Sequence, residues 1–205
     1  MQEEGVVRNM VHNFITPSII KESSNGFLRC TIQDEMLQKR EIECVGKITA
    51  ESVYSLILQI RYLQGEDSES QITMYINSPG GEVASGLALY DVMKAVSCPI
   101  RTVCVGMVAS MGALLFLSGD KRDILLHGRI MIHDPLLADG IGGSALKIQS
   151  ISNDLMRIRE ITGKIIAEHT GKTLEEVYEK TAEDSYFYAE EAVSFGLADN
   201  IIYEI

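Results

Sequence analysis

The apolar positions after residue 40 follow two periods and define the first predicted elements. Between Arg40 and Val45, polar and apolar residues alternate with the period of two that is typical of a half-buried strand. After Thr49, a favourable N-cap residue, apolar side chains recur at spacings of three and four up to about Leu63. The pattern therefore predicts a strand followed by an amphipathic helix.

The rest of the chain also alternates between strand-like and helix-like patterns. Short apolar runs end in turns, and each turn leads into a segment with helical periodicity. Strands are predicted over 72–76, 102–106 and 129–133, and helices from the turn at 77–81 to about 96, over 110–119, 144–169 and 189–195, with a capping box at 173–176 that starts a further short helix. No internal repeat is evident. We therefore predict an α/β fold with largely parallel strand pairing.

The first 26 residues differ from the rest because they show little periodicity. They contain Pro17 and a turn-like run over Ser23–Gly26. We predict a flexible arm or processed leader over residues 1–26 and a single folded domain over residues 27–205.

Composition and charge exclude several classes of function. The 205 residues can bury one core, and 18 basic against 29 acidic residues give a formal net charge of −11. Nucleic-acid binding needs a basic surface, so this charge argues against it. The longest apolar run, near Met111–Leu117, is too short to span a membrane, and no secretory signal is visible. We predict a cytoplasmic protein with no membrane contact.

The four cysteines carry no recognisable metal or redox motif. None stands in CxxC spacing, which argues against a zinc site. Cys98 and Cys104 lie in apolar surroundings and are expected to be small buried hydrophobic residues.

Two strand-to-helix junctions have residues suited to acyl chemistry. Asn77–Gly81 ends in two glycines, whose exposed N–H groups can bind an anion or a developing oxyanion; a plain tight turn explains the pattern equally well. Ser110, within Gly106–Gly112, has its hydroxyl at a helix N-terminus, where the dipole favours negative charge. An ordinary N-cap serine is the simpler interpretation of that residue taken alone.

A histidine and a carboxylate would complete a nucleophilic site. His133 ends a predicted strand, where sites gather in α/β sheets, but a structural histidine is the simpler interpretation of this residue taken alone. The other histidines lie in the arm (His12), in a turn (His127) and at a helix end (His169). Spacing does not choose among the available acids, which are Asp123, Asp134, Asp139, Asp154, Asp184 and Asp199.

Several ordered motifs resemble the signature blocks of the Clp protease proteolytic subunit. They are Asn77–Gly81, Gly106–Gly112, Arg129–Pro135, Glu168–Gly171 and Ala189–Ala192 with Gly196–Leu197, so the resemblance extends from about residue 40 to 205. It implies a crotonase-like spiral of ββα units, a single domain with a long helix as a handle.

The resemblance also implies a role for each site residue. Ser110 matches the nucleophile, His133 the general base, and Asp184 the acid that orients the histidine. The N–H groups of Gly81 and Met111 match the oxyanion hole. The implied activity is that of a serine endopeptidase that hydrolyses unfolded polypeptides to short peptides.

The implied partners follow from the same family. Subunits are expected to form heptameric rings, stacked as a tetradecamer, with an AAA+ unfoldase that feeds substrate; a paralogous subunit in the rings is an open alternative. No metal or cofactor is expected in this chain. The chain has no Walker motif, so ATP would be used by the unfoldase.

The sequence departs from the family pattern in places that bear on assembly. Asp134 stands where the family typically has Gln, and Ala182-Glu183 where it usually has an Asp-Arg pair. The 136–143 loop is about two residues longer, and the N-terminal third lacks the usual opening. Two alternatives to the peptidase remain. A crotonase-type acyl-CoA hydratase or isomerase would share the fold and the two-N–H oxyanion hole, and the departures leave open a non-catalytic ring subunit.

Overall fold

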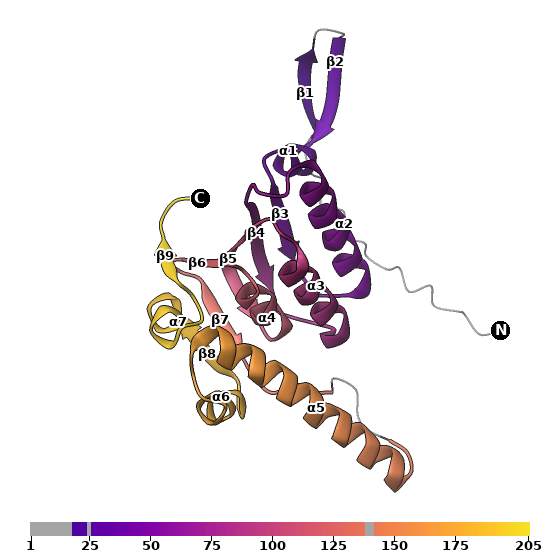
Figure 1. The fold of residues 1–205 in the computed structure, drawn as a ribbon, viewed down its shortest axis with the longest axis vertical. Helices are drawn as coiled ribbons and strands as arrows, with labels where there is room; N and C mark the ends of the chain where they lie inside the picture. The colour runs from indigo at the N-terminus through magenta and orange to yellow at the C-terminus, as the bar shows by residue number, and fades with distance from the viewer. Residues whose placement is uncertain (1–17, 24–25, 138–141) are drawn as a thin grey trace, which may run out of the picture. The chain divides into compact units, whose positions relative to one another are not determined.

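The computed structural model describes residues 18–23, 26–137 and 142–205 (Figure 1). The chain divides into two compact units, Met1–Lys39 and Arg40–Ile205. Most of the predicted arm, residues 1–17, lies outside the described residues. The predicted boundary between residues 26 and 27 falls at the start of a strand, and the larger unit begins only at Arg40.

The smaller unit contains a hairpin and a short helix that the sequence patterns did not indicate. Strands β1 (Ser18–Ser23) and β2 (Gly26–Thr31) pair in antiparallel fashion. Helix α1 (Ile32–Gln38) follows, and the side chain of Thr31 accepts from the backbone N–H of Asp34 to cap it. The carboxylate of Asp34 accepts in turn from the backbone N–H of Thr31, which completes a capping box.

A seven-stranded sheet organises the larger unit. Its parallel path runs in the order β3-β4-β5-β6-β9, and β7 pairs with the C-terminal part of β5, with β8 antiparallel to β7. The strands are β3 (Glu41–Val45), β4 (Ile72–Ser78), β5 (Ile100–Ala109), β6 (Lys121–Leu125), β7 (Arg129–Ile132), β8 (Ser185–Tyr188) and β9 (Asn200–Ile202). The prediction of an α/β fold with largely parallel pairing is confirmed, and the short strands β6, β8 and β9 are additions to it.

The predicted helices are present, with small differences at their ends. Helix α2 begins after Thr49 as expected but continues a turn past Leu63, and α6 has the predicted capping box at Thr173. The helices of the larger unit are α2 (Ala50–Glu66), α3 (Val83–Ala95), α4 (Met111–Leu117), α5 (Ala145–Thr170), α6 (Leu174–Thr181) and α7 (Ala189–Phe195). The prediction that α7 stops at Gly196 is also confirmed, since this glycine has a φ of 94°.

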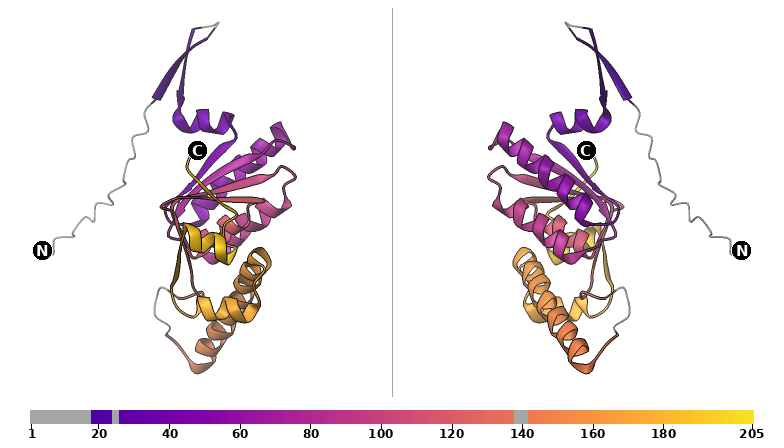
Figure 2. Two further views of the ribbon diagram at one scale, coloured as in Figure 1. Left: turned by 90° about the vertical axis from the view of Figure 1, so that its left-hand side faces the viewer. Right: turned by 90° about the vertical axis from the view of Figure 1, so that its right-hand side faces the viewer.

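Helices α2, α3 and α4 cover one face of the sheet (Figures 1 and 2). Every residue of α4 is buried, so this helix forms the centre of the core. The 26-residue helix α5 buries only residues in its second half, where it contacts α4 and α6. Its first half extends away from the sheet as the predicted handle (Figure 1).

The cysteines behave as the sequence suggested. Cys98 and Cys104 are buried and unpaired with each other, as predicted. Burial raises the pKa of the Cys104 thiol to about 12, which makes it a poor nucleophile. Within the described part of the chain, no helix combines the length and apolar character needed to cross a membrane.

A buried ionic cluster joins three adjacent strands at the far edge of the sheet. The Asp123 side chain on β6 is fully buried and accepts from Nε of Arg101 on β5 at 2.6 Å and from Nδ2 of Asn200 on β9 at 3.0 Å. Burial raises the pKa of Asp123, but the two hydrogen bonds and the positive charges of Arg101 and Lys121 together outweigh it, so the pKa lies below its ordinary value of 3.8. The carboxylate therefore stabilises the fold in its ionised form.

We predict that Asp123→Asn lowers the free energy of unfolding by about 3 kcal/mol at pH 7, because it leaves Arg101 without its buried partner. A carboxylate whose pKa is lower in the folded state than in the unfolded state stabilises the fold fully at pH values above its unfolded-state pKa. This stabilisation is lost as the pH falls through the folded-state pKa. The difference between wild type and variant should therefore be full above pH 4 and shrink below it. Urea unfolding at several pH values measures both effects.

The exposed pair Glu160–Lys164 provides the control. Both side chains are about 60% exposed, so Glu160→Gln should change stability by less than about 0.5 kcal/mol. Equal losses in the two variants would contradict a stabilising role for the buried cluster.

Candidate active site

Three turns meet where the parallel strands β4, β5 and β7 end. Pairing of Ser78 with Val108 and of Ala109 with Met131 sets these strand ends side by side. The turn at Gly80–Gly81 follows β4, Ser110 follows β5, and His133 follows β7. Carboxyl ends of parallel strands are the usual place for a site in an α/β sheet.

Ser110 occupies a strained backbone conformation at the junction between β5 and α4. Its φ of 55° and ψ of −123° are rare for a residue with a side chain, and such strain costs about 1–3 kcal/mol. Its N–H donates to the carbonyl of Met131 at 2.9 Å, which fixes the turn to β7. Its hydroxyl makes no capping hydrogen bond with α4, so the interpretation as an ordinary N-cap serine is wrong.

The Ser110 hydroxyl instead faces His133. Oγ lies 2.8 Å from Nε2 of the imidazole, and the histidine side chain is only 14% exposed. The other imidazole nitrogen, Nδ1, lies 3.4 Å from Oδ1 of Asp184. The structure thus aligns Ser110, His133 and Asp184 in one row.

The other candidate carboxylates have different surroundings. Asp123 lies in the buried cluster described above, and Asp199 forms an ion pair with Arg122. Asp134 follows His133 but turns toward Arg159 and Thr181. Asp154 lies on α5, and Asp139 is outside the described residues. Of the candidate acids that the structure describes, only Asp184 pairs with the His133 ring.

The other histidines take no part in this row. His169 at the end of α5 shares a hydrogen bond of 2.8 Å with the hydroxyl of Tyr90. Burial and the nearby cations Lys94 and Arg122 lower its pKa, so it stays neutral at pH 7. His127 lies in the turn between β6 and β7, and His12 is outside the described residues.

The two glycines hold the turn after β4 against the loop that carries Ile48. Ile48 donates to the carbonyl of Gly80 at 2.9 Å and accepts from the N–H of Glu82 at 3.0 Å. A side chain on Gly81 would place its Cβ 2.1 Å from the Ile48 carbonyl oxygen. The close approach of these two backbones therefore requires glycine at position 81.

Two N–H groups remain free next to Ser110. Those of Gly81 and Met111 donate to no acceptor within the described ranges. Both are held firmly: Ser78, fully buried, accepts from the N–H of Gly80 at 3.1 Å, and the Met111 side chain packs where Gly86 leaves room. Free, fixed donors beside a nucleophile are what an oxyanion hole requires.

Two hollows adjoin the Ser110 hydroxyl. An open cleft of about 410 Å³ includes Lys47, Pro79, Gly81 and Leu136 together with Ser110 and His133. A smaller pocket shares Val83, Ser110, His133 and Pro135 with the cleft. The rest of its lining is mostly apolar and consists of Met111, Leu114, Ile132, Ile166 and Thr162. The cleft can hold an extended chain, and the apolar pocket adds a recess of about 20 Å³ beside it.

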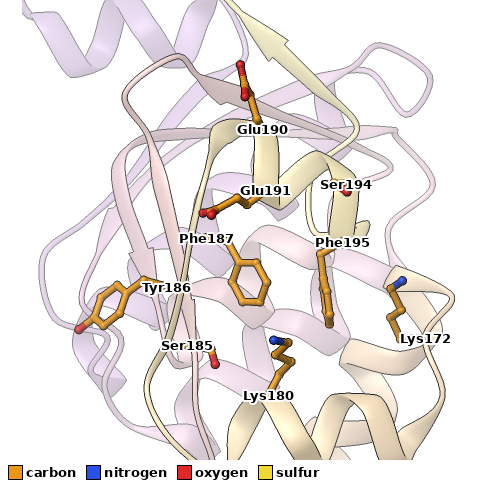
Figure 3. A pocket seen from close by; sticks show the side chains of 9 residues that line it. All are labelled: Lys172, Lys180, Ser185, Tyr186, Phe187, Glu190, Glu191, Ser194 and Phe195. Atoms are coloured by element: carbon orange, nitrogen blue, oxygen red, sulfur yellow. The ribbon is translucent and has the colours of Figure 1, made fainter.

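Figure 3 shows a separate hollow of about 580 Å³, and neither Ser110, His133 nor Asp184 lines it. The rings of Phe187 and Phe195 lie 4.9 Å apart inside it, with Lys172 and Lys180 nearby. Two glutamates, Glu190 and Glu191, balance these lysines, so the hollow offers a ligand no net charge. It contains neither Ser110 nor His133 and has no group arranged for catalysis.

The sequence did not reveal a polar cluster that lies close to His133 and Asp184 in the fold. Asp134, Thr181 and Arg159 are separated by up to 47 positions and contact one another only in the fold. Arg159 pairs with Asp134 within the chain, with its Nε 2.5 Å from Oδ2. Among the residues that the structure describes, no group of His, Cys, Asp and Glu could hold a metal ion.

A comparison with protein-family models agrees with the resemblance in the motifs. A model described as Clp protease matches residues 24–204. The matched range includes the turn at Gly81, Ser110, His133 and Asp184.

We predict that Gly81→Ala lowers the free energy of unfolding by about 1–3 kcal/mol, because the new methyl group overlaps the Ile48 backbone. Gly65→Ala is the matched control. Gly65 lies in α2 with no atom near its Cβ position, so alanine should add up to about 1 kcal/mol of stability. Chemical unfolding measures both; a Gly81 variant as stable as wild type would show that the turn can move aside.

Proposed function

Because the chain belongs to the Clp protease family, we propose that it is a serine endopeptidase with Ser110 as its nucleophile and His133 as its general base. The contact of 2.8 Å between Ser110 Oγ and His133 Nε2 carries the proposal. A hydratase of the related crotonase type would not need this pair, and a non-catalytic subunit would have no reason to strain Ser110. The contact therefore favours the peptidase over both alternatives.

The proposed reaction is acyl transfer through a serine ester. His133 Nε2 accepts the Ser110 proton as Oγ attacks the carbonyl carbon of the scissile peptide bond. The carbonyl oxygen becomes an oxyanion and accepts from the N–H groups of Gly81 and Met111. The carbon–nitrogen bond breaks as His133 returns the proton to the leaving amine, and a water molecule, activated by the same imidazole, hydrolyses the ester.

Asp184 is proposed to keep the histidine in the reactive tautomer. Its carboxylate faces Nδ1, so the proton stays on that nitrogen and leaves Nε2 free to accept from Ser110. The separation of 3.4 Å is longer than a strong hydrogen bond, as is common before substrate binds. Asp184 is 59% exposed, so its position depends on the segments on either side of it.

The substrate is proposed to be an unfolded polypeptide that lies extended in the cleft and is cut to short peptides. The apolar lining of the neighbouring pocket favours an uncharged group next to the cleaved bond, and its volume of about 20 Å³ limits that group to a small one. The chemistry needs no metal or cofactor, because the side chains and free N–H groups supply the base and the oxyanion stabilisation.

Assembly into rings is proposed from the family together with the surface of α5. Apolar side chains are exposed along its described length, namely Leu146, Ile148, Met156 and Ile161. An amphipathic helix with an exposed apolar face is suited to packing against another subunit. We propose stacked heptameric rings in the cytoplasm, fed by an AAA+ unfoldase that uses the ATP.

We predict that Ser110→Ala abolishes peptide hydrolysis, with a loss of about 10⁴–10⁶ in kcat, and also abolishes labelling by a fluorophosphonate probe. Ser97→Ala is the control, since its hydroxyl lies at the surface and contacts only the Ser68 carbonyl. Mass spectrometry locates the label, and sedimentation of the same samples gives the particle mass. Labelling that persists in the Ser110 variant would assign the nucleophile to another residue.

We predict that Asp184→Asn reduces kcat by about 10⁴ because the amide favours the wrong imidazole tautomer. The variant should fold normally, since the side chain is mostly exposed. The adjacent exposed residue gives a matched control: Glu183→Gln removes one charge but should keep most of the activity. Steady-state kinetics on a fluorogenic peptide would show the choice of acid to be wrong if the two variants behaved alike.

A further inference from the structure

We propose that Asp134 is a positioning residue, which acts through Thr181 and Arg159 to hold Asp184 against the His133 ring. The inference rests on the proposed function, because it assigns a support to the same site. Asp134 is not placed to touch substrate, and its carboxylate contacts Thr181 and Arg159.

Two backbone pairings, one on each side, connect the segment that contains His133 with the segment that contains Asp184. On one side, Ile132 pairs with Ser185 in the antiparallel ladder between β7 and β8. On the other side, the N–H of Asp134 donates to the carbonyl of Thr181 at 2.7 Å. His133 lies between Ile132 and Asp134, and Asp184 lies between Thr181 and Ser185. The distance between His133 and Asp184 therefore depends on the pairing of Asp134 with Thr181.

The Asp134 side chain strengthens the pairing with Thr181 through two further hydrogen bonds. Its Oδ1 accepts from the hydroxyl of Thr181 at 2.6 Å, and its Oδ2 accepts from Nε of Arg159 at 2.5 Å. Thr181 ends helix α6 and is 3% exposed, so it is a fixed point just before the segment with Asp184. A carboxylate bonded to an arginine is held in one orientation more tightly than a neutral group would be.

Arg159 links this cluster to the long helix. Its guanidinium lies over the ring of Tyr178 on α6 with its central carbon 3.8 Å from the ring centre. Gly163, one turn further along α5, lets the same ring approach closely, since a Cβ there would lie 2.6 Å from it. Helices α5 and α6 are thus joined around the residue that anchors the segment with the acid.

Asp184 depends on these neighbouring contacts because its own side chain is mostly exposed and makes few contacts. Within the described ranges it forms no bond other than the 3.4 Å contact with His133. Weaker pairing between Thr181 and Asp134 would let the Asp184 carboxylate move. A shift of about 1 Å in a catalytic group can reduce the rate about 10²-fold.

The test begins with Thr181→Val, which removes the hydroxyl at almost constant shape and leaves every charge in place. We expect kcat on a fluorogenic peptide amide to fall about 10- to 100-fold with little change in KM. Thr181→Ser keeps the hydroxyl and should restore most of kcat. Arg159→Met is a second variant at a partly exposed position and should lower kcat in the same way, so the test does not depend on the folding of one protein.

The decisive measurement repeats Thr181→Val in an Asp184→Asn background. If Thr181 acts through Asp184, the second substitution should change the residual rate by less than about twofold. A general structural defect would lower kcat by the same factor in the wild-type and Asp184→Asn backgrounds, and that outcome overturns the inference. A wild-type kcat in both Thr181→Val and Arg159→Met also overturns it. A wild-type protein that neither hydrolyses the peptide nor reacts with the fluorophosphonate at Ser110 overturns the proposed function instead, so the two failures are distinct.

Discussion

Strand β5 pairs with β6 over Arg101–Cys104 and with β7 over Met107–Ala109, and this change of partner along one edge determines where the site lies. Gly106, with a φ of 87°, stands between the two pairings. The change brings the end of β7, and with it His133, level with the end of β5 and Ser110. If β5 did not change its partner, Ser110 and His133 would follow strands whose ends lie at different positions along the sheet.

The buried helix α4 makes the strained serine possible. Strain at Ser110 persists because the residues on both sides of it are fixed, by the bond to Met131 and by the seven buried residues of α4. The same helix positions the N–H of Met111. The proposed nucleophile and the proposed oxyanion donor are therefore parts of the core, and the stability of the core determines their geometry.

Part of this arrangement could be predicted from sequence because it is local. Gly81, Ser110 and His133 each follow a strand, and the period of the apolar residues locates strand ends well. The acid could not be chosen by spacing, because Asp184 meets His133 through a fold contact over 51 positions of chain that pass through α5 and α6. Asp134, Thr181 and Arg159 were missed for the same reason, and the strands β6, β8 and β9 because three to five residues carry too little pattern.

The exposure of Asp184 divides the site into two parts that differ in how freely their sequence can change. Near Ser110, a side chain added at Gly81 or Gly86 would meet close-packed neighbours. The segment that carries the acid is open to solvent at Ala182, Glu183 and Asp184, so substitutions there meet no packing barrier. The Ala182-Glu183 pair lies in this exposed segment, whereas Gly81 and Gly86 lie where neighbouring atoms leave no room for a larger residue.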